Sequence, residues 1–249
     1  ILKGDIKKLS ERLGDKFKKV AFFITNQGYP MRTKVNAYMA DMTLAIYENN
    51  LTPGEKLTKQ YATDKTVRKT EKNEYGFDVS ELIPVGKDQQ RYYGFNLNVI
   101  EENKDLYIQQ FADQIIRQLA NTTPNDKGVI NFSLNIAGNS IANTIRSQEE
   151  LDILTDEILT KAWAIVEQNN KLANRKVKLS IRTGMQTGID ESGFKWALKN
   201  DVFINSAIPS NYRLVQEDGT ETNDIITFFE RFIDKTEVKQ EPIKSNQAD

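Results

Sequence analysis

The groups with which this chain could do chemistry are oxygen, amide, lysine and arginine side chains. Among its 249 residues there is no histidine and no cysteine. Disulfides, thiol chemistry and zinc sites built from Cys or His are therefore excluded, and so are nucleophile systems that use imidazole as the base. An enzyme of this sequence would have to use Asp, Glu, Lys or Tyr, or an oxygen-bound Mg²⁺ or Ca²⁺.

Polar residues alternate with large apolar ones in three segments of the chain, residues 91–100, 128–138 and 175–184. Successive side chains of a strand point to opposite faces, so in each segment the polar residues share one face. Amides, hydroxyls and cations on a rigid sheet could bind a peptide, a glycan or a nucleic-acid strand. The alternative is a face that is simply solvated, or one covered by other segments. The candidate binding residues are Asn96, Asn98, Asn131, Ser133, Asn135, Lys178 and Arg182.

Acidic residues offer a weaker signal. Asp190 and Glu191 follow a glycine, with Lys195 nearby, and Glu217–Asp218 form a second acidic tip. Neither group has the spacing of an EF-hand, and neither G-x-G-x-x-G nor G-x-x-x-x-G-K-[ST] occurs. The segment 183–188 (TGMQTG) matches no nucleotide-binding motif. We therefore predict no catalytic residue, no metal site and no cofactor.

Residues 51–88 form a segment rich in Lys and Thr with few large apolar residues, which predicts an inserted polar arm. A mobile basic arm would bind phosphates in a salt-dependent, sequence-independent way. Acidic residues are interleaved with the cations, however, and favour the interpretation as a soluble loop. The cations are Lys56, Lys59, Lys65, Arg68, Lys69 and Lys72.

Hydrophobic periodicity predicts the main elements. Residues 104–120 have a helical stripe, and Ser147-Gln-Glu-Glu150 is a capping box that opens a long helix. Asn223 is expected to cap a further short helix, and Asp218-Gly219 indicates a tight turn. Strands are predicted within residues 19–26, 42–48, 91–100, 128–138 and 175–184, and residues 195–204 and 212–222 resemble strands.

Strands of a sheet covered by helices on both faces are apolar throughout. Because these strands alternate, the pattern predicts an α+β fold: a two-layer sandwich, with a mixed or antiparallel sheet and the helices packed on one face. We expect a single domain over residues 1–235, with the arm at about 51–88, and a flexible polar tail over 236–249.

The charges nearly cancel, with 34 Lys and Arg against 35 Asp and Glu, which argues against a surface built wholly for nucleic acid or anionic membrane. No apolar run approaches the length of a membrane span. The chain does not begin with Met, so a removed leader or anchor and a piece of a longer protein are both open hypotheses.

The first functional hypothesis is a non-catalytic binding or assembly module with a protein or peptide partner, such as the soluble part of an envelope-associated or surface protein. The alternative is a nucleic-acid-associated protein, in one version a metal-dependent nuclease that uses carboxylates and the Lys/Thr-rich arm. Self-association through the open face or an edge strand is a third hypothesis.

Overall fold

The computed structural model describes residues 20–25, 29–72, 78–99, 102–209, 213–216, 218–223 and 231. Its centre is a six-stranded sheet in which every neighbouring pair of strands is parallel. In spatial order the strands are β1 (Val20–Thr25), β8 (Phe203–Pro209), β7 (Lys176–Thr183), β6 (Val129–Gly138), β2 (Met42–Tyr47) and β5 (Tyr92–Asn96).

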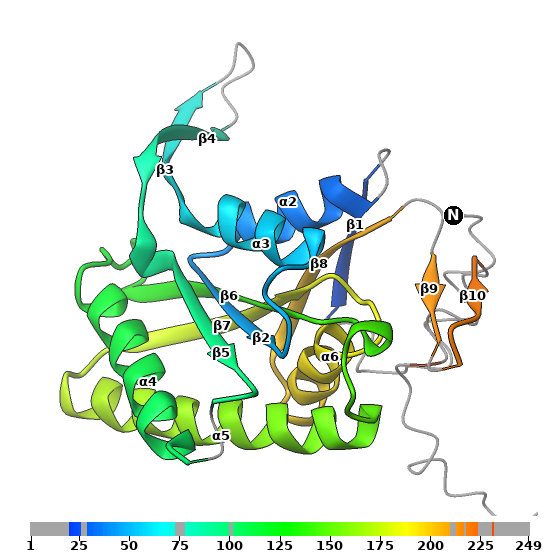
Figure 1. Cartoon of the computed structure of the whole chain (residues 1–249). Helices are drawn as coiled ribbons and strands as arrows, with labels where there is room; N and C mark the ends of the chain where they lie inside the picture. Colours follow the sequence, from blue (N-terminus) through cyan, green and yellow to red (C-terminus); the bar gives the residue numbers. More distant parts are fainter. Residues whose placement is uncertain are drawn as a thin grey trace, which may run out of the picture.

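Helices cover both faces of this sheet (Figure 1). Helices α2 (Tyr29–Met39) and α3 (Pro53–Thr63) pack side by side over one face. The other face carries α4 (Lys104–Ala120), α5 (Gln148–Leu172) and α6 (Ile189–Lys199), with α5 in contact with both of the others. Short 3₁₀ turns lie at Gln89–Arg91 and Ile141–Asn143. The protein is therefore an α/β fold of three layers.

The prediction of helices together with a sheet is confirmed, but the two-layer arrangement with a mixed or antiparallel sheet is wrong. The alternation itself is real. Leu134 and Ile136 of β6 are buried on the face of α4, α5 and α6, where most of the large core side chains lie. The opposite face is covered in part by α2 and α3, whose buried residues are small or polar: Arg32, Asn36, Ala37, Glu55, Thr58, Ala62 and Thr63. A helix can thus cover a polar sheet face when hydrogen bonds replace apolar packing.

Asn36 shows how α2 is attached to that polar face. Its Nδ2 donates to the carbonyl oxygens of Thr183 and Ala207, each at 3.0 Å, and its Oδ1 accepts from Ala207 N at 2.7 Å. One buried amide therefore joins α2 to the neighbouring strands β7 and β8. Such a contact leaves no apolar signature in the strand sequence.

The segment 51–88 contains more regular structure than the arm that we predicted. Its first part is α3, which packs against α2 and β2. Its second part is an antiparallel ribbon of β3 (Asp64–Lys72) and β4 (Asp78–Lys87) that extends away from the body (Figure 1). Helix α3 was missed because the residues that it buries are polar or small and form no stripe of large apolar side chains: Glu55, Thr58, Ala62 and Thr63.

Several predicted elements are confirmed, among them the helix 104–120 and the capping box of Ser147 and Glu150. Residues 195–199, predicted as strand, are the end of α6. The two short antiparallel strands β9 (Leu214–Val215) and β10 (Glu221–Thr222) flank the predicted turn at Asp218-Gly219. The helix predicted after Asn223 and the tail 236–249 lie outside the described residues.

Arg91 ties the base of the ribbon to the body. Its guanidinium donates to the carbonyl oxygens of Asp64 (2.5 Å), Tyr38 (2.9 Å) and Ala40 (2.5 Å). These carbonyls belong to the end of α2 and the start of β3. A planar guanidinium can serve three acceptors in fixed directions, which a single ammonium group cannot do.

We therefore expect Arg91→Lys to lower the free energy of unfolding by about 2 kcal/mol, since half-buried carbonyls lose charge-assisted hydrogen bonds. Urea unfolding monitored by circular dichroism measures the change. Arg117→Lys, on the exposed side of α4, is the matched control and should unfold like the wild type. Equal stability of the two variants would contradict this role of Arg91.

Candidate functional site

The connections of the sheet point to one position on its edge. From β2 the chain passes through α3 and the ribbon to β5 on one side, whereas from β6 it passes through α5 to β7 on the other side. Strands β2 and β6 are neighbours, so two adjacent strands send their chains in opposite directions. In doubly wound sheets, ligands bind outside the carboxyl ends of the strands at such a switch point.

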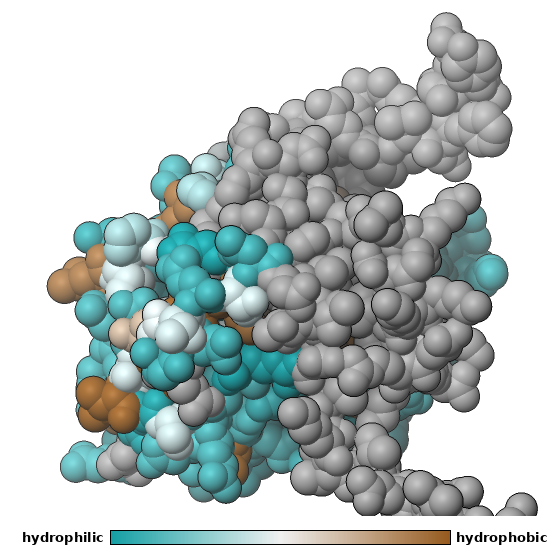
Figure 2. All heavy atoms as spheres, turned by 90° about the vertical axis from the view of Figure 1, so that its right-hand side faces the viewer, coloured by the Kyte–Doolittle hydropathy of each residue, from teal (hydrophilic) through white to brown (hydrophobic). Residues whose placement is uncertain are grey.

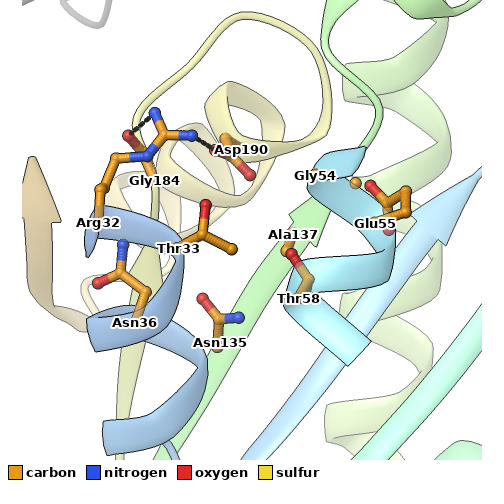
Figure 3. Close-up of a pocket in the computed structure, with 11 residues that line it drawn as sticks. Arg32, Thr33, Asn36, Gly54, Glu55, Thr58, Asn135, Ala137, Gly184 and Asp190 are labelled. Atoms are coloured by element: carbon orange, nitrogen blue, oxygen red, sulfur yellow. Dashed lines mark hydrogen bonds and ion pairs between the residues drawn. The ribbon is translucent and has the colours of Figure 1, made fainter. Parts of the chain in front are cut away.

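A hollow of about 60 Å³ opens beside this point, between the amino-terminal parts of α2 and α3 (Figure 3). A volume of this size has room for several water molecules or for a small polar group. Polar side chains and glycines form most of its wall. The lining residues are Arg32, Thr33, Asn36, Gly54, Glu55, Thr58, Asn135, Ala137, Gly138, Gly184 and Asp190.

Arg32 and Asp190 form one wall of the hollow. The Arg32 guanidinium donates to Gly184 O at 2.7 Å, and its other terminal nitrogen lies 3.6 Å from Asp190 Oδ2 (Figure 3). Both side chains are less than a tenth exposed. Burial raises the pKa of Asp190 to about 6, although the Arg32 charge acts in the opposite direction. Near pH 7 this wall therefore holds a buried ion pair.

Glu55 lies in the first turn of α3, where one of the two hydrogen bonds of a capping box is present. Thr52 Oγ1 accepts from Glu55 N at 3.2 Å, and a Thr-x-x-Glu pattern normally adds a bond from the glutamate back to the capping residue. Ser147 and Glu150 make both bonds. Glu55 does not make the second one. The residue is 4% exposed, and its Oε2 has no hydrogen-bond partner in the described structure. Figure 3 shows its side chain on the side of α3 away from Arg32 and Asn135.

The surroundings of Glu55 favour its neutral form. Burial, with a further contribution from the charge of Asp190, raises the pKa of Glu55 to about 8. Burial and the proximity of Glu55 also raise the pKa of Tyr47 and of Tyr92, so both phenols stay protonated. Gly94 makes room for this group, because a Cβ there would lie 2.8 Å from the Tyr47 hydroxyl.

Asn135 points into the hollow from β6 (Figure 3). It is 2% exposed; its Nδ2 donates to Thr43 Oγ1 at 3.3 Å, and its Oδ1 has no partner among the described residues. A threonine hydroxyl can accept or donate, so the amide can rotate and present either its oxygen or its nitrogen to the hollow while keeping the bond to Thr43. Asn135 can therefore meet either a donor or an acceptor.

The other sequence-predicted residues are only partly brought together. Asn131, Ser133, Lys178 and Arg182 lie on the same face as Asn135, because Asn131 pairs with Lys178 and Asn135 with Arg182 in the register of β6 and β7. Asn131 and Lys178 are exposed, Ser133 is half-buried, and Arg182 is buried, with its Nε donating to Ser133 Oγ at 3.2 Å. None of these four residues lines the hollow.

Asn96 and Asn98 lie elsewhere, at and just beyond the carboxyl end of β5. Asn96 Oδ1 accepts from Asn98 N at 3.0 Å, and Asn98 Nδ2 donates to Glu48 O at 2.8 Å. The Asn96 amide therefore stabilises the local turn, and the Asn98 amide joins this turn to the chain just after β2. Of the seven residues predicted as a binding set, Asn135 alone contributes to the hollow.

The predicted acidic cluster separates in the structure. Asp190 faces the hollow, but Glu191 is 1% exposed and forms ion pairs with Lys195 at 2.7 Å and with Arg231 at 2.5 Å. Asp218 accepts from Thr220 within its own turn, and Glu217 lies outside the described residues. Glu191 and Lys195 are therefore part of a structural ion-pair network.

Sequence reasoning missed Arg32, Glu55 and Gly184. A signal for Gly184 was present, because two glycines occur in residues 183–188, directly after a strand. The structure shows why glycine is needed at 184: a Cβ there would lie 2.3 Å from Asp190 Oδ2. Thr52-x-x-Glu55 was a signal for the start of α3. Nothing in the local sequence marks Arg32, because its partners are about 150 residues away.

No family model, curated protein or solved structure matches this chain. In the described part of the chain, no three carboxylate side chains are grouped so that they could hold a metal ion. Among the same residues, none of the helices combines the length and the hydrophobicity that crossing a bilayer requires.

Proposed function

We propose that the protein binds a small polar ligand, whose head group enters the hollow between α2 and α3. The supporting observation is that Asn135, which is 2% exposed, points into this hollow and that its Oδ1 has no hydrogen-bond partner among the described residues (Figure 3). A buried polar atom without a partner costs about 1–3 kcal/mol, so such atoms are rare unless something else satisfies them. A bound head group would do so.

The position of the hollow supports the same proposal. It lies at the carboxyl edge beside the switch point, and the glycine at 54 leaves open space at its wall. Figure 2 views the side of the molecule that is on the right in Figure 1, and its described surface is mainly hydrophilic with separate hydrophobic residues. The mainly polar lining of the hollow itself matches a polar ligand. The proposal keeps the predicted binding module but gives it a small polar ligand in place of the protein or peptide partner that we predicted.

Asn135→Leu tests the proposal directly. We expect a ligand that raises the melting temperature of the wild type to lose at least tenfold in affinity, because leucine fills the hollow with an apolar group that cannot form hydrogen bonds. A thermal-shift panel of sulfate, acetate, methylammonium and glycerol, followed by titration calorimetry, measures this. Asn131→Leu changes the same residue type on the same face of β6 at an exposed position and should bind like the wild type. Unchanged binding by Asn135→Leu would disprove the site.

The nucleic-acid alternative is a separate proposal, supported by the projecting ribbon β3–β4, whose first strand is rich in Lys and Thr. Fluorescence anisotropy of labelled single- and double-stranded oligonucleotides at two salt concentrations tests it. A steep salt dependence would favour it, and cleavage on addition of Mg²⁺ would indicate the nuclease. Absence of binding at low salt would remove it.

A further inference from the structure

The charges at the hollow are already balanced. Among the described residues that line it, only Arg32, Glu55 and Asp190 are ionisable, and Arg32 and Asp190 are paired with each other. Asp190 also accepts hydrogen bonds from the backbone N–H groups of Gly184 and Gln186. The Glu55 side chain lies on the side of α3 away from Arg32 (Figure 3). A buried charge needs an opposite charge to pair with, and neither an anion nor a cation finds one here that is not already used. An uncharged group therefore fits best.

The amide of Asn135 is the group left to bind such a ligand. It points into the hollow from β6, and its Oδ1 has no hydrogen-bond partner among the described residues (Figure 3). Its Nδ2 carries two N–H donors, of which one bonds to Thr43 Oγ1 at 3.3 Å. The second N–H forms no hydrogen bond within the described part of the chain. Asn135 thus offers one acceptor and one donor in the plane of a single rigid group.

The space in front of Asn135 suits a small polar group. Asn135 lies between Thr33 of α2 and Thr58 of α3, and the described lining contains no aromatic and no large apolar side chain (Figure 3). A hollow of about 60 Å³ has room for roughly four water-sized groups, as many as the non-hydrogen atoms of acetamide. Gly54 leaves open space at the wall, through which a larger molecule could carry this group.

We infer that the hollow binds a primary carboxamide, a neutral planar group with an N–H donor beside a carbonyl acceptor. The ligand N–H donates to Asn135 Oδ1, and the ligand carbonyl accepts from the second N–H of Asn135. Asn side chains bind the edge of adenine by the same pair of hydrogen bonds. This inference depends on the proposed function and names the ligand class. Asn135 is then the residue that selects an amide over charged groups of the same shape.

Three probes of nearly the same shape separate charge from size. Acetate, acetamide and acetamidinium are planar and, at neutral pH, negative, uncharged and positive. Titration calorimetry of the full chain should show binding of acetamide at millimolar concentrations, and affinities at least tenfold lower for the two ions. Acetate lacks the donor for Asn135 Oδ1 and acetamidinium lacks the acceptor for the N–H, so each ion leaves one buried polar atom unsatisfied.

A fourth probe, N-methylacetamide, tests the pairing of the two edges and the source of the amide. It keeps a donor and an acceptor, but its trans amide places them on opposite sides of the molecule. It should therefore bind at least tenfold more weakly than acetamide. Because it has the form of a peptide backbone, it also separates a primary amide from the main chain of a peptide partner.

Asn135→Asp should reverse the preference, since it replaces the N–H donor by a second acceptor oxygen with little change of shape. Acetamidinium, which has two donors on one edge, should become the tightest of the three planar probes, and acetamide should lose at least tenfold in affinity. Asn131→Asp makes the same change at an exposed position on the same face of β6 and should keep the wild-type order. If Asn135→Asp does not fold, the order of the probes on the wild type decides.

The possible failures are distinguishable. If acetate, acetamidinium or glycerol binds the wild type more tightly than acetamide and Asn135→Leu abolishes this binding, the inference is wrong while the proposed function stands. Equal binding of N-methylacetamide and acetamide, or a folded Asn135→Asp that still prefers acetamide, would likewise overturn the inference alone. If Asn135→Leu leaves acetamide binding intact, or if no probe binds, both the inference and the proposed function fail.

Discussion

Replacing Glu55 by Gln is expected to raise the free energy of unfolding at pH 9 by roughly 5 kcal/mol and to change it little at pH 4.5, because the pKa of Glu55 is raised from 4.5 to about 8 and each unit corresponds to about 1.4 kcal/mol. The unfolded chain releases this proton near pH 4.5, and the folded protein only near pH 8. Between these values the folded state holds one more proton than the unfolded state, so rising pH favours unfolding. Glutamine carries no charge and removes this dependence.

Urea unfolding without added ligand at pH 4.5, 7 and 9 measures the effect. Asp190 contributes in the same direction between about pH 4 and 6, since its pKa is raised from 3.8 to about 6, but this contribution is common to both proteins. Glu150→Gln should show the opposite pH dependence of stability. Hydrogen bonds from Ser147 lower the pKa of Glu150, so its ionised carboxylate stabilises the folded state at neutral pH and this contribution is lost only as the pH falls. If wild type and Glu55→Gln lose stability in parallel from pH 4.5 to 9, the buried neutral acid is disproved.

Gly138→Ala is expected to destabilise the protein by roughly 3 kcal/mol or more, because overpacking against rigid groups forces the backbone to move. A Cβ at this end of β6 would lie 2.0 Å from Ile46 O and 2.7 Å from the Ile189 side chain. The close approach of β2, β6 and α6 beside the hollow therefore depends on the missing side chain.

Gly54→Ala provides the matched control for this substitution. It also adds one methyl group at the hollow, but to open space in a helix, where alanine is favoured over glycine by up to about 1 kcal/mol. Guanidinium unfolding should therefore show Gly54→Ala equal to or above the wild type and Gly138→Ala well below it. Similar curves for the two variants would contradict the tight contact at Gly138.

Local features of the fold could be predicted because their causes are local. The apolar stripe of 104–120 and the pair Ser147 and Glu150 each involve residues within one or two helical turns, and the structure confirms both. The parallel pairing and the helices on the second face could not be predicted, because their contacts are distant in the sequence. Asn36, which attaches α2 to the sheet, bonds to residues about 150 to 170 positions away. The alternation of β6 was recognised, but its polar side was taken to be open.

The candidate site was predictable only in part for the same reason. Asn135 stood out as a polar residue in a strand, whereas Glu55 looked like one of several acids in a mixed-charge segment. Its burial arises because α3 packs against α2 and β2, which brings the carboxyl near Asp190, 135 positions later in the chain. The desolvation that changes its chemistry exists only in the folded state.

By itself, the sequence determined which chemistry is absent and which face of each strand is polar, because residue types and a period of two are properties of the chain. The tertiary structure alone decided that α2 and α3 cover part of this polar face, and that Arg32, Glu55, Asn135 and Asp190 line one hollow. The physical reason is that hydrogen bonds and charges between distant segments depend on how the layers pack, which no local pattern records.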